Sequence, residues 1–473
     1  MMMNKLREFF SIDIRSLALF RIGLALVVLC DLFIRMHDIK AFYSDEGILP
    51  RSVLIESALD NWNFSINLMS GMWEIQLLLM IMLGIFATFL LIGYKTRLAT
   101  AATWVLLLSL QLRNPIALQG GDAAEKLFLF FGMFLPLGAC WSLDMRLKKS
   151  PEKSVEKSVF SIGTAALLLQ VCFIYWFAAL LKNDPTWKTE GTAIWYALSI
   201  EQYATPLGLF LLGYPLLLKI LTISTFYLEA LGPFFAFSPI WTGPLRLATV
   251  IIFILFHLGL ALTIELAQFP YICAVGWLAF IPPCFWNFFS IEEAQTAPCL
   301  KFGKLSNGLA AFFLVYVALW NVQTLKVPLP FFSTWKSIGN FLGLDQKWDM
   351  FSPYPLTLDG WYVIPGTLRN GQVVDLFTGR DFVSWIKPPL LSATYKNDRW
   401  RSYLMNLAID EEGDASLFFP SYASYLCNEW DASHPFEQQL ISLDIYYMSK
   451  INNYDAPTYE YKKQRIWQQK FKE

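Results

Sequence analysis

Apolar residues run in long stretches through the first two thirds of the chain, and polar residues collect in the gaps between them. Each stretch is long enough for a helix to cross roughly 30 Å of hydrocarbon, which takes about 20 residues. The pattern predicts an all-α, polytopic membrane helix bundle over residues 10–325. Its expected spans are 16–34, 73–93, 98–113, 124–141, 160–181, 206–238, 245–264, 267–287 and 307–323.

One stretch leaves the number of crossings open. Residues 206–238 are more than one crossing needs, and Lys219 interrupts them. This stretch is either one long tilted helix or a short interfacial segment that leads into a span. The sequence therefore predicts eight or nine spans.

The pattern changes after about Pro330. Residues 361–377 (WYVIPGTLRNGQVVDLF) hold two β-rich runs around Asn370-Gly371, a strong signal for a hairpin. Two amphipathic helices are expected in NDRWRSYLMNLAID and PSYASYLCNEWDAS, and a further strand in QQLISLDIYYMS. We predict a small C-terminal α+β extramembrane domain over residues 330–473, packed on the membrane surface.

Basic residues in the short loops predict the orientation, because they favour the cytoplasmic side. With the N-terminus inside, the inner loops hold Lys5, Arg7, Arg15, Lys95, Arg97, Arg146, Lys148, Lys149, Lys153, Lys157, Arg246, Lys301 and Lys304. The outer loops then hold only Arg35, Lys40, Arg51, Arg113, Lys126, Lys182 and Lys188. We expect a multi-pass protein of the bacterial inner membrane, with a cytoplasmic N-terminus. Nine spans place the C-terminal domain outside the cytoplasm, and eight place it inside.

Composition narrows the possible functions. The chain is 55% hydrophobic and 16% charged, below the quarter that soluble domains usually carry, and its net charge of -1 gives no sign of nucleic-acid binding. The seven cysteines form no CxxC pair and the three histidines lie far apart, so we expect no metal site. No phosphate-binding loop, nucleophile elbow or HExxH motif is present.

A few ionisable residues interrupt the apolar stretches. Each is a functional candidate, because a charge at the centre of a membrane helix costs roughly 2.5–3.5 kcal/mol. Each also has a structural interpretation. Asp31 and Arg35 have i, i+4 spacing for an ion pair, and His257 can be a hydrogen-bonded core residue. Glu229 and Glu265 can be polar contacts between helices.

Two further candidates carry the same ambiguity. Asp122, Glu125 and Lys126 share one helical face and can neutralise one another at a helix start. Lys182 closes its span and can extend its ammonium to the lipid headgroups. Alternatively, partial removal of Lys182 from water lowers its basicity and makes it a general base towards an amphipathic ligand that arrives from the lipid.

Several segments resemble vitamin K-dependent gamma-glutamyl carboxylases. They are FIYWFAALLKNDPTW (173–187), Phe256-His257 followed by Phe269-Pro270-Tyr271, and KWDMFSPYP (347–355). The segments RIGLALVVLCDL, AFYSDEGILPRSVL, LQGGDAAEKL and LPLGACWSLD are similar to the bacterial members of this superfamily, the horizontally transferred transmembrane (HTTM) proteins. The resemblance runs over residues 10–380, with the motifs in the same order.

The resemblance implies a chemistry. In the carboxylases a base lysine deprotonates reduced vitamin K, oxygen adds, and the resulting alkoxide removes a γ-proton from a glutamate that captures carbon dioxide, without a metal. Lys182 would be the base, and His257 would line the same pocket. The quinol pocket would also include Asp122, Lys126, Trp187, Glu229 and Tyr271. The cofactor would be reduced vitamin K or menaquinol, and the partner a peptide or protein substrate.

Two departures keep alternatives open. Animal-type carboxylases carry an Asn-His pair where this chain reads QGGDAAEK, and their C-terminal region is several times longer. The first hypothesis is a quinol-dependent carboxylase or epoxidase (a lyase) that acts on an extracytoplasmic substrate. The second is a non-catalytic membrane factor for maturation or export of a secreted peptide, as some bacterial relatives are. A transporter, the third, would need a polar path between both membrane faces.

Overall fold

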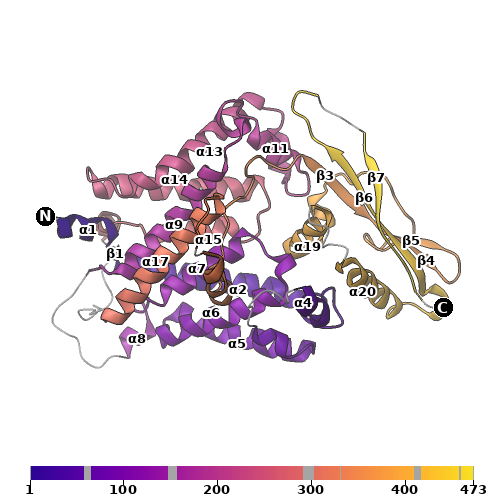
Figure 1. The fold of residues 1–473 in the computed structure, drawn as a ribbon, viewed down its shortest axis with the longest axis horizontal. Coiled ribbons are helices and arrows are strands. Elements are labelled where there is room, and N and C mark those ends of the chain that lie inside the picture. The colour runs from indigo at the N-terminus through magenta and orange to yellow at the C-terminus, as the bar shows by residue number, and fades with distance from the viewer. Residues whose placement is uncertain are drawn as a thin grey trace.

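A computed structural model describes residues 2–57, 65–147, 157–290, 303–330, 332–409, 417–456 and 460–471. A bundle of helices makes up one part of the molecule, and a β-sheet with two helices covers one end of it (Figure 1). The N-terminus lies at the opposite end of the bundle from the sheet. Of the basic residues expected in inner loops, Lys148, Lys149, Lys153 and Lys301 lie outside the described residues.

Among the described residues, six helices are long and apolar enough to cross a membrane. They are α2 (Ile14–His37), α5 (Trp73–Ile92), α9 (Ile162–Leu181), α13 (Pro215–Phe235), α14 (Thr242–Thr263) and α17 (Lys304–Thr324). The prediction of a helical, multi-pass membrane protein is confirmed. The predicted count of eight or nine spans is not, because other expected spans form helices that are shorter or less apolar.

Prolines account for two of the differences. Stretch 206–238 divides before Pro215 into α12 (Pro206–Leu211) and α13, so its short-segment alternative is the one observed. Stretch 267–287 divides before Pro283 into α15 (Phe269–Leu278) and α16 (Pro283–Phe288), because a proline restricts the residue before it and lacks an N–H. Two other helices, α6 (Thr96–Arg113) and α7 (Gly120–Gly132), also lie in the bundle.

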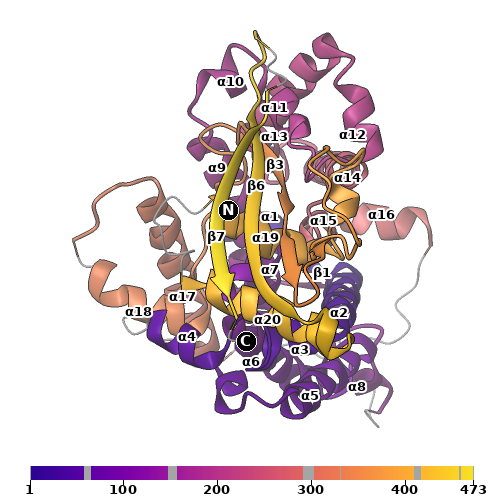
Figure 2. The same cartoon turned by 90° about the vertical axis from the view of Figure 1, so that its right-hand side faces the viewer.

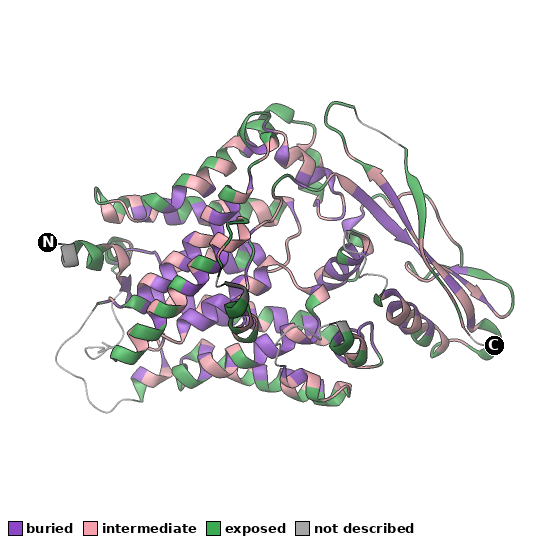
Figure 3. Ribbon diagram, viewed as in Figure 1, coloured by how far each residue is buried: buried purple, intermediate pink, exposed green. Residues whose placement is uncertain are grey.

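The outer faces of the bundle are apolar. Figure 3 shows exposed residues along the outermost helices, and many of them are large hydrophobic side chains. Leu216 on α13, Leu255 on α14 and Leu78 on α5 are more than half exposed. A soluble protein rarely leaves so much apolar surface in water, whereas lipid chains cover it without cost.

The end that carries the N-terminus is tied together by short elements. Helix α1 (Met2–Phe10) leads to β1 (Ile12–Asp13), which pairs with β2 (Ser158–Val159). In α8 (Leu143–Arg146), the Asp144 carboxylate accepts hydrogen bonds from the backbone of Lys95 and Thr96 at the turn between α5 and α6. The remaining short helices of the bundle are α3 (Ile39–Tyr43), α4 (Arg51–Ser57), η1 (Ile66–Met69), η2 (Pro115–Ala117), α10 (Pro185–Lys188), α11 (Ala193–Ser199) and α18 (Phe332–Leu342).

The C-terminal region is an antiparallel sheet with two helices on the side of the bundle (Figure 1). The strands are β3 (Leu358–Val363), β4 (Pro365–Leu368), β5 (Val373–Asp375), β6 (Leu440–Ile451) and β7 (Lys462–Lys470), in the order β3-β6-β4-β5 with β7 on β6. Figure 2 looks onto this sheet, with β6 and β7 crossing the end of the molecule. The helices are α19 (Asp398–Ile409) and α20 (Phe419–Asp431), with short turns η3 (Ser392–Thr394) and η5 (Phe436–Gln438).

These elements confirm the predicted α+β character. The expected hairpin is β4–β5, and Gly371 in its turn has φ +84°, which a glycine adopts without strain. Both amphipathic helices and the strand β6 also form where they were expected. Strand β7, which the sequence analysis did not predict, pairs with β6 along nearly its whole length.

The segment that follows α18 returns into the bundle before the sheet begins. Trp348 is fully buried, and its indole donates to Gln346 Oε1 at 2.9 Å. Gln170 of α9 donates to the same oxygen at 2.8 Å, and Lys126 of α7 pairs with Asp345 at 2.8 Å. Residues 344–351, which we call the return segment, therefore belong to the packing of the bundle.

Candidate functional site

A mostly apolar cavity lies among α9, α11, α13, α14 and the return segment. It holds about 630 Å³ of space, including its opening, and little of that space lies far from the walls. The cavity is therefore narrow. Its polar lining includes Tyr175, Lys182, Trp187, Glu229 and His257, and its apolar lining includes Phe256, Leu260, Phe269, Met350 and Phe351.

Lys182 is the cation of this cavity. Its side chain is 4% exposed and forms an ion pair with Glu229 of α13, whose side chain is 9% exposed. The Lys182 ammonium also lies 4.7 Å from the centre of the Trp187 ring. Lys182 is thus held inside the protein by an anion and an aromatic face, and it does not extend to the lipid headgroups.

The local sequence explains how Lys182 and Trp187 meet. Helix α9 ends at Leu181, and the next residue, Lys182, caps it with a ψ of 66° that leaves the helical region. Asp184 then caps the next helix by accepting from the Thr186 N–H, and Pro185 occupies its first turn. This tight reversal places Trp187 beside Lys182, and its indole donates to the Phe351 carbonyl at 3.0 Å.

His257 belongs to a chain of three side chains from three helices. The Trp277 indole of α15 donates to the Tyr175 hydroxyl of α9 at 2.8 Å. That hydroxyl lies 2.6 Å from Nε2 of His257 on α14. Nδ1 of His257 is buried and has no hydrogen-bond partner among the described residues. His257 is hydrogen-bonded, as its structural interpretation expected, and it also lines the cavity.

The structure brings together four of the seven site residues that the sequence suggested. Lys182, His257, Glu229 and Trp187 line one cavity. Three others lie elsewhere: Tyr271 is 58% exposed on α15, Lys126 pairs with Asp345, and Asp122 belongs to a separate charged cluster. Their part in a quinol pocket has no support from this placement.

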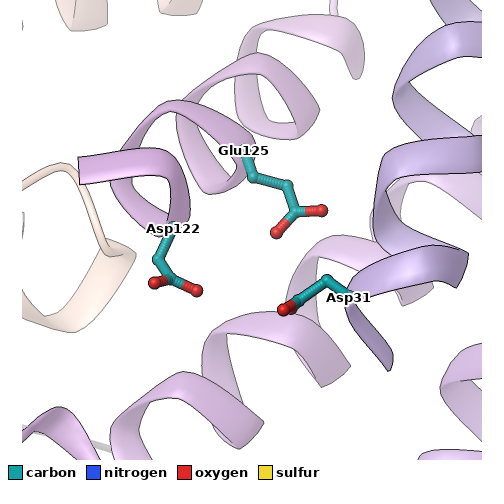
Figure 4. A group of neighbouring side chains, drawn as sticks. All are labelled: Asp31, Asp122 and Glu125. Carbon is teal, nitrogen blue, oxygen red and sulfur yellow. The ribbon is translucent and has the colours of Figure 1, made fainter. Parts of the chain in front are cut away.

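The separate cluster consists of the carboxylates of Asp31, Asp122 and Glu125, which Figure 4 shows turned towards one another, and two guanidinium groups. Arg35 pairs with Asp31 at 2.6 Å and also with Asp122, so the predicted i, i+4 ion pair is confirmed. Arg399 of α19 pairs with Asp31 at 2.5 Å and with Asp122 at 2.6 Å. The cluster therefore ties the C-terminal region to the bundle.

This arrangement corrects the interpretation of Asp122, Glu125 and Lys126 as a self-neutralising group. Lys126 turns away to Asp345, and two arginines from other helices neutralise Asp122 instead. The pattern of one helix could not reveal partners that are distant in the sequence. Glu125 is left fully buried, and neither of its carboxylate oxygens has a hydrogen-bond partner among the described residues.

The cluster has the ligand atoms for a cation but is already filled by arginines. Its three carboxylates offer oxygens within 4.8 Å of one another. Arg35 and Arg399, however, donate to the oxygens of both aspartates. Burial and the nearby Arg35 charge lower the pKa of Arg399, but Asp122 and Asp31 outweigh them and raise it above its ordinary value. Arg399 thus stays charged as a structural counter-ion.

A second, more polar cleft adjoins the cavity. The two share Leu266, Phe269, Met350 and Phe351 as lining residues. The cleft holds about 1350 Å³ of space, including its open mouth. Its polar lining comes from both parts of the molecule and comprises Gln119, Tyr203, Asp349, Ser352, Tyr354, Ser402 and Asn406.

Sequence reasoning missed several residues of the site. Tyr175 lies seven residues before Lys182, which is about two helical turns, so both fall on one face of α9. That spacing was a usable signal. Met350 and Phe351 lie in the KWDMFSPYP motif, yet nothing in the motif shows that it returns to the bundle. Arg399 carried no signal, because an arginine on an amphipathic helix is ordinarily solvent-exposed.

These features define a helical, multi-pass membrane protein with a lysine-containing cavity near the end of α9. The chain belongs to the HTTM domain family, which it matches over residues 9–285, so the resemblance to bacterial HTTM proteins is confirmed. It is 29% identical over 276 residues to the sporulation-delaying protein SdpB of Bacillus subtilis (strain 168). That match covers 56% of this chain and 80% of SdpB. No solved structure matches.

Proposed function

We propose that this HTTM protein is a membrane enzyme that binds a quinol in the apolar cavity and uses Lys182 as the base that deprotonates it. The observation that carries the proposal is the buried Lys182–Glu229 pair in the wall of a cavity that also contains His257. A membrane cavity lined by apolar side chains, with a few polar groups, suits an amphipathic ring compound. The family resemblance of the lysine motif supports the same choice.

The residues present fit such a ligand. The cavity is narrow, and a planar ring fits a narrow space better than a bulky group does. Phe256, Phe269 and Phe351 offer apolar surface to its faces. A bound quinol would supply the reducing electrons of the reaction. Lys182, Glu229 and His257 would supply the hydrogen bonds and the proton acceptor.

Glu229 gives Lys182 a way to act as a base. An ammonium cannot accept a proton, so Lys182 must first lose one. Transfer of that proton to Glu229 leaves a neutral amine beside a neutral carboxylic acid. Burial favours this transfer, because it penalises both charges of the pair. The neutral amine then accepts the hydroxyl proton of the quinol, and the new ammonium stabilises the oxyanion that is left.

The polar cleft is the proposed site of a substrate outside the cytoplasm. It borders the cavity and receives polar side chains from the C-terminal region. We further propose nine membrane passes, made by the six long helices, α6, α7 with the residues that follow it, and the pair α15 and α16. Support comes from the described basic residues near the N-terminal end, such as Arg7, Lys95 and Arg146, and from the sheet at the opposite end (Figure 1).

Quinol oxidation by the purified protein in lipid nanodiscs tests the proposed enzymatic function. We would supply menaquinol-4 or reduced vitamin K with oxygen and measure the quinone epoxide. Lys182→Ala should lower the rate by about 10²–10⁴-fold, the range for loss of a general base. Lys188→Ala is the matched control, because Lys188 lies six positions after Lys182 in the sequence and is exposed. If the folded wild-type protein oxidised neither quinol, the proposed enzymatic function would be refuted.

The relationship to SdpB and the size of the cleft favour a second candidate. The protein would then be a non-catalytic membrane factor that binds a secreted peptide in the cleft during its maturation or export. In that case Lys182→Ala should leave peptide secretion intact. Enlarging a cleft side chain, as in Ser352→Trp, should block it, and secretion assays on both variants separate the two functions.

A further inference from the structure

The hydrogen-bond chain Trp277–Tyr175–His257 has a direction. An indole N–H can only donate, so the Tyr175 oxygen accepts from Trp277. The Tyr175 hydroxyl therefore has its own proton free to donate. Its neighbour at 2.6 Å is Nε2 of His257, and a neutral imidazole nitrogen is a strong acceptor.

The neighbours of Tyr175 favour donation to His257. Among the residues that the structure describes, the other acceptor beside the hydroxyl is the thiol of Cys273, whose sulfur is a weak acceptor. If Nε2 carried the ring proton, Tyr175 would have to give its own proton to that sulfur. The arrangement with Tyr175 donating to Nε2 is therefore the stronger one, and the ring proton of the buried, neutral His257 lies on Nδ1.

The Nδ1–H of His257 is then an unused donor. The residue is 1% exposed, and Nδ1 has no partner among the described residues. A buried donor without a partner is unfavourable, and a ligand with an acceptor oxygen would give it one. Because His257 lines the cavity, the ligand that occupies the cavity is the natural acceptor.

We propose that Tyr175 and Trp277 fix His257 as an Nδ1–H donor to a ring oxygen of the cavity ligand. This inference rests on the proposed quinol function and deepens it. A para-quinol has two ring oxygens, so Lys182 deprotonates one while His257 holds the other. In these roles His257 contacts the ligand, and Tyr175 is a positioning residue that acts through His257.

Nitrogen-15 NMR of labelled histidine tests the inference directly. The chain has only three histidines, so the variant His37→Gln/His434→Gln leaves His257 as a single probe. In ligand-free nanodiscs its nitrogen shifts should report a neutral ring protonated at Nδ1. Tyr175→Phe should convert the spectrum to a mixture of tautomers, whereas Tyr271→Phe, the matched change at an exposed tyrosine, should not. A ring protonated at Nε2 in the parent protein overturns the proposal.

Titration with oxidised menaquinone-4, which needs no turnover, tests the acceptor. Binding should shift the Nδ1 resonance, and His257→Phe should weaken binding by about five- to tenfold, as loss of one hydrogen bond predicts. If the quinone binds without moving that resonance, the donor role falls while the proposed function stands. If the quinone binds neither the parent protein nor any variant, the proposed quinol function is refuted. The tautomer of His257 measured without ligand is unaffected by that outcome.

Discussion

At the scale of single residues, the charged cluster at the end of α2 leaves one carboxyl out of balance. Asp31 and Asp122 share the two arginines, and Glu125 has no hydrogen-bond partner among the described residues. Three carboxylates therefore face two guanidinium groups. The ionised form of Glu125 is the unfavourable charge of the cluster, because like charges repel and burial removes water.

This imbalance predicts opposite effects for two similar substitutions. Asp122→Asn removes a partner of Arg35 and Arg399 and should cost about 3–5 kcal/mol of unfolding free energy, as broken buried ion pairs do. Glu125→Gln removes the unbalanced carboxyl and should leave stability unchanged or raise it. Denaturant unfolding in detergent micelles would measure both variants. Equal losses would show that Glu125 is paired in the folded protein.

Residue spacing also explains why Tyr271 lies away from the cavity lining. The FPY motif suggested that its members act together, but each residue of a helix turns by about 100°. Phe269 faces the cavity, so Tyr271, two positions later, lies on the other side of α15 and is exposed. Lys182 and Glu229 were identifiable because each is an ionisable residue within or at the end of an apolar stretch.

At the scale of elements, strand β3 brings a carboxyl against the bundle. Asp359 is 1% exposed, and its Oδ1 is 3.5 Å from the Gln202 amide near the end of α11. Burial raises the pKa of Asp359 from 3.8 to about 6, and the nearby Glu201 carboxylate adds to the rise. The folded protein thus binds this proton more tightly than the unfolded chain does.

The raised pKa gives a pH dependence with a definite sign. The contribution of Asp359 to stability is complete below about pH 4 and is lost as the pH rises through about 6. The loss amounts to about 3 kcal/mol, at 1.36 kcal/mol per pKa unit. The stability of Asp359→Asn relative to the wild type should therefore rise when the pH is raised from 4.5 to 7.5. Urea unfolding at the two pH values would measure this. Asp381→Asn, at an exposed carboxyl, is the control. If Asp359→Asn changed the unfolding free energy equally at both pH values, the prediction would be contradicted.

Local patterns predicted the elements that local interactions make. The Asn370-Gly371 turn and the amphipathic pattern of α19 each depend on neighbouring residues, so both could be predicted. Strand β7 could not, because the charged run KKQRIWQQK has no buried face of its own and forms by pairing with β6. The return segment was equally hidden, since its contacts join residues that lie far apart in the sequence.

At the scale of the whole molecule, the proposed nine passes place the two ends of the protein on opposite sides of the membrane. Reporter fusions in intact cells test this. Alkaline phosphatase fused to the C-terminus should be active outside the cytoplasm, and a fusion after Ser290, which ends before α17, should be inactive. Fluorescent-protein fusions at the same positions should show the reverse pattern. Phosphatase activity at both positions, or at neither, would rule out α17 as the last crossing.

Because of the return segment, the part of the chain that matches the family and the part that lines the cavity are not the same. The family match ends at residue 285, yet Met350 and Phe351 form part of the cavity wall. The stretch of chain that the family model matches is thus shorter than the stretch that lines the cavity. A recombination event that replaced everything after α17 would also replace this wall. Related proteins that share the helices but differ in the tail should therefore diverge in ligand choice while keeping the same lysine.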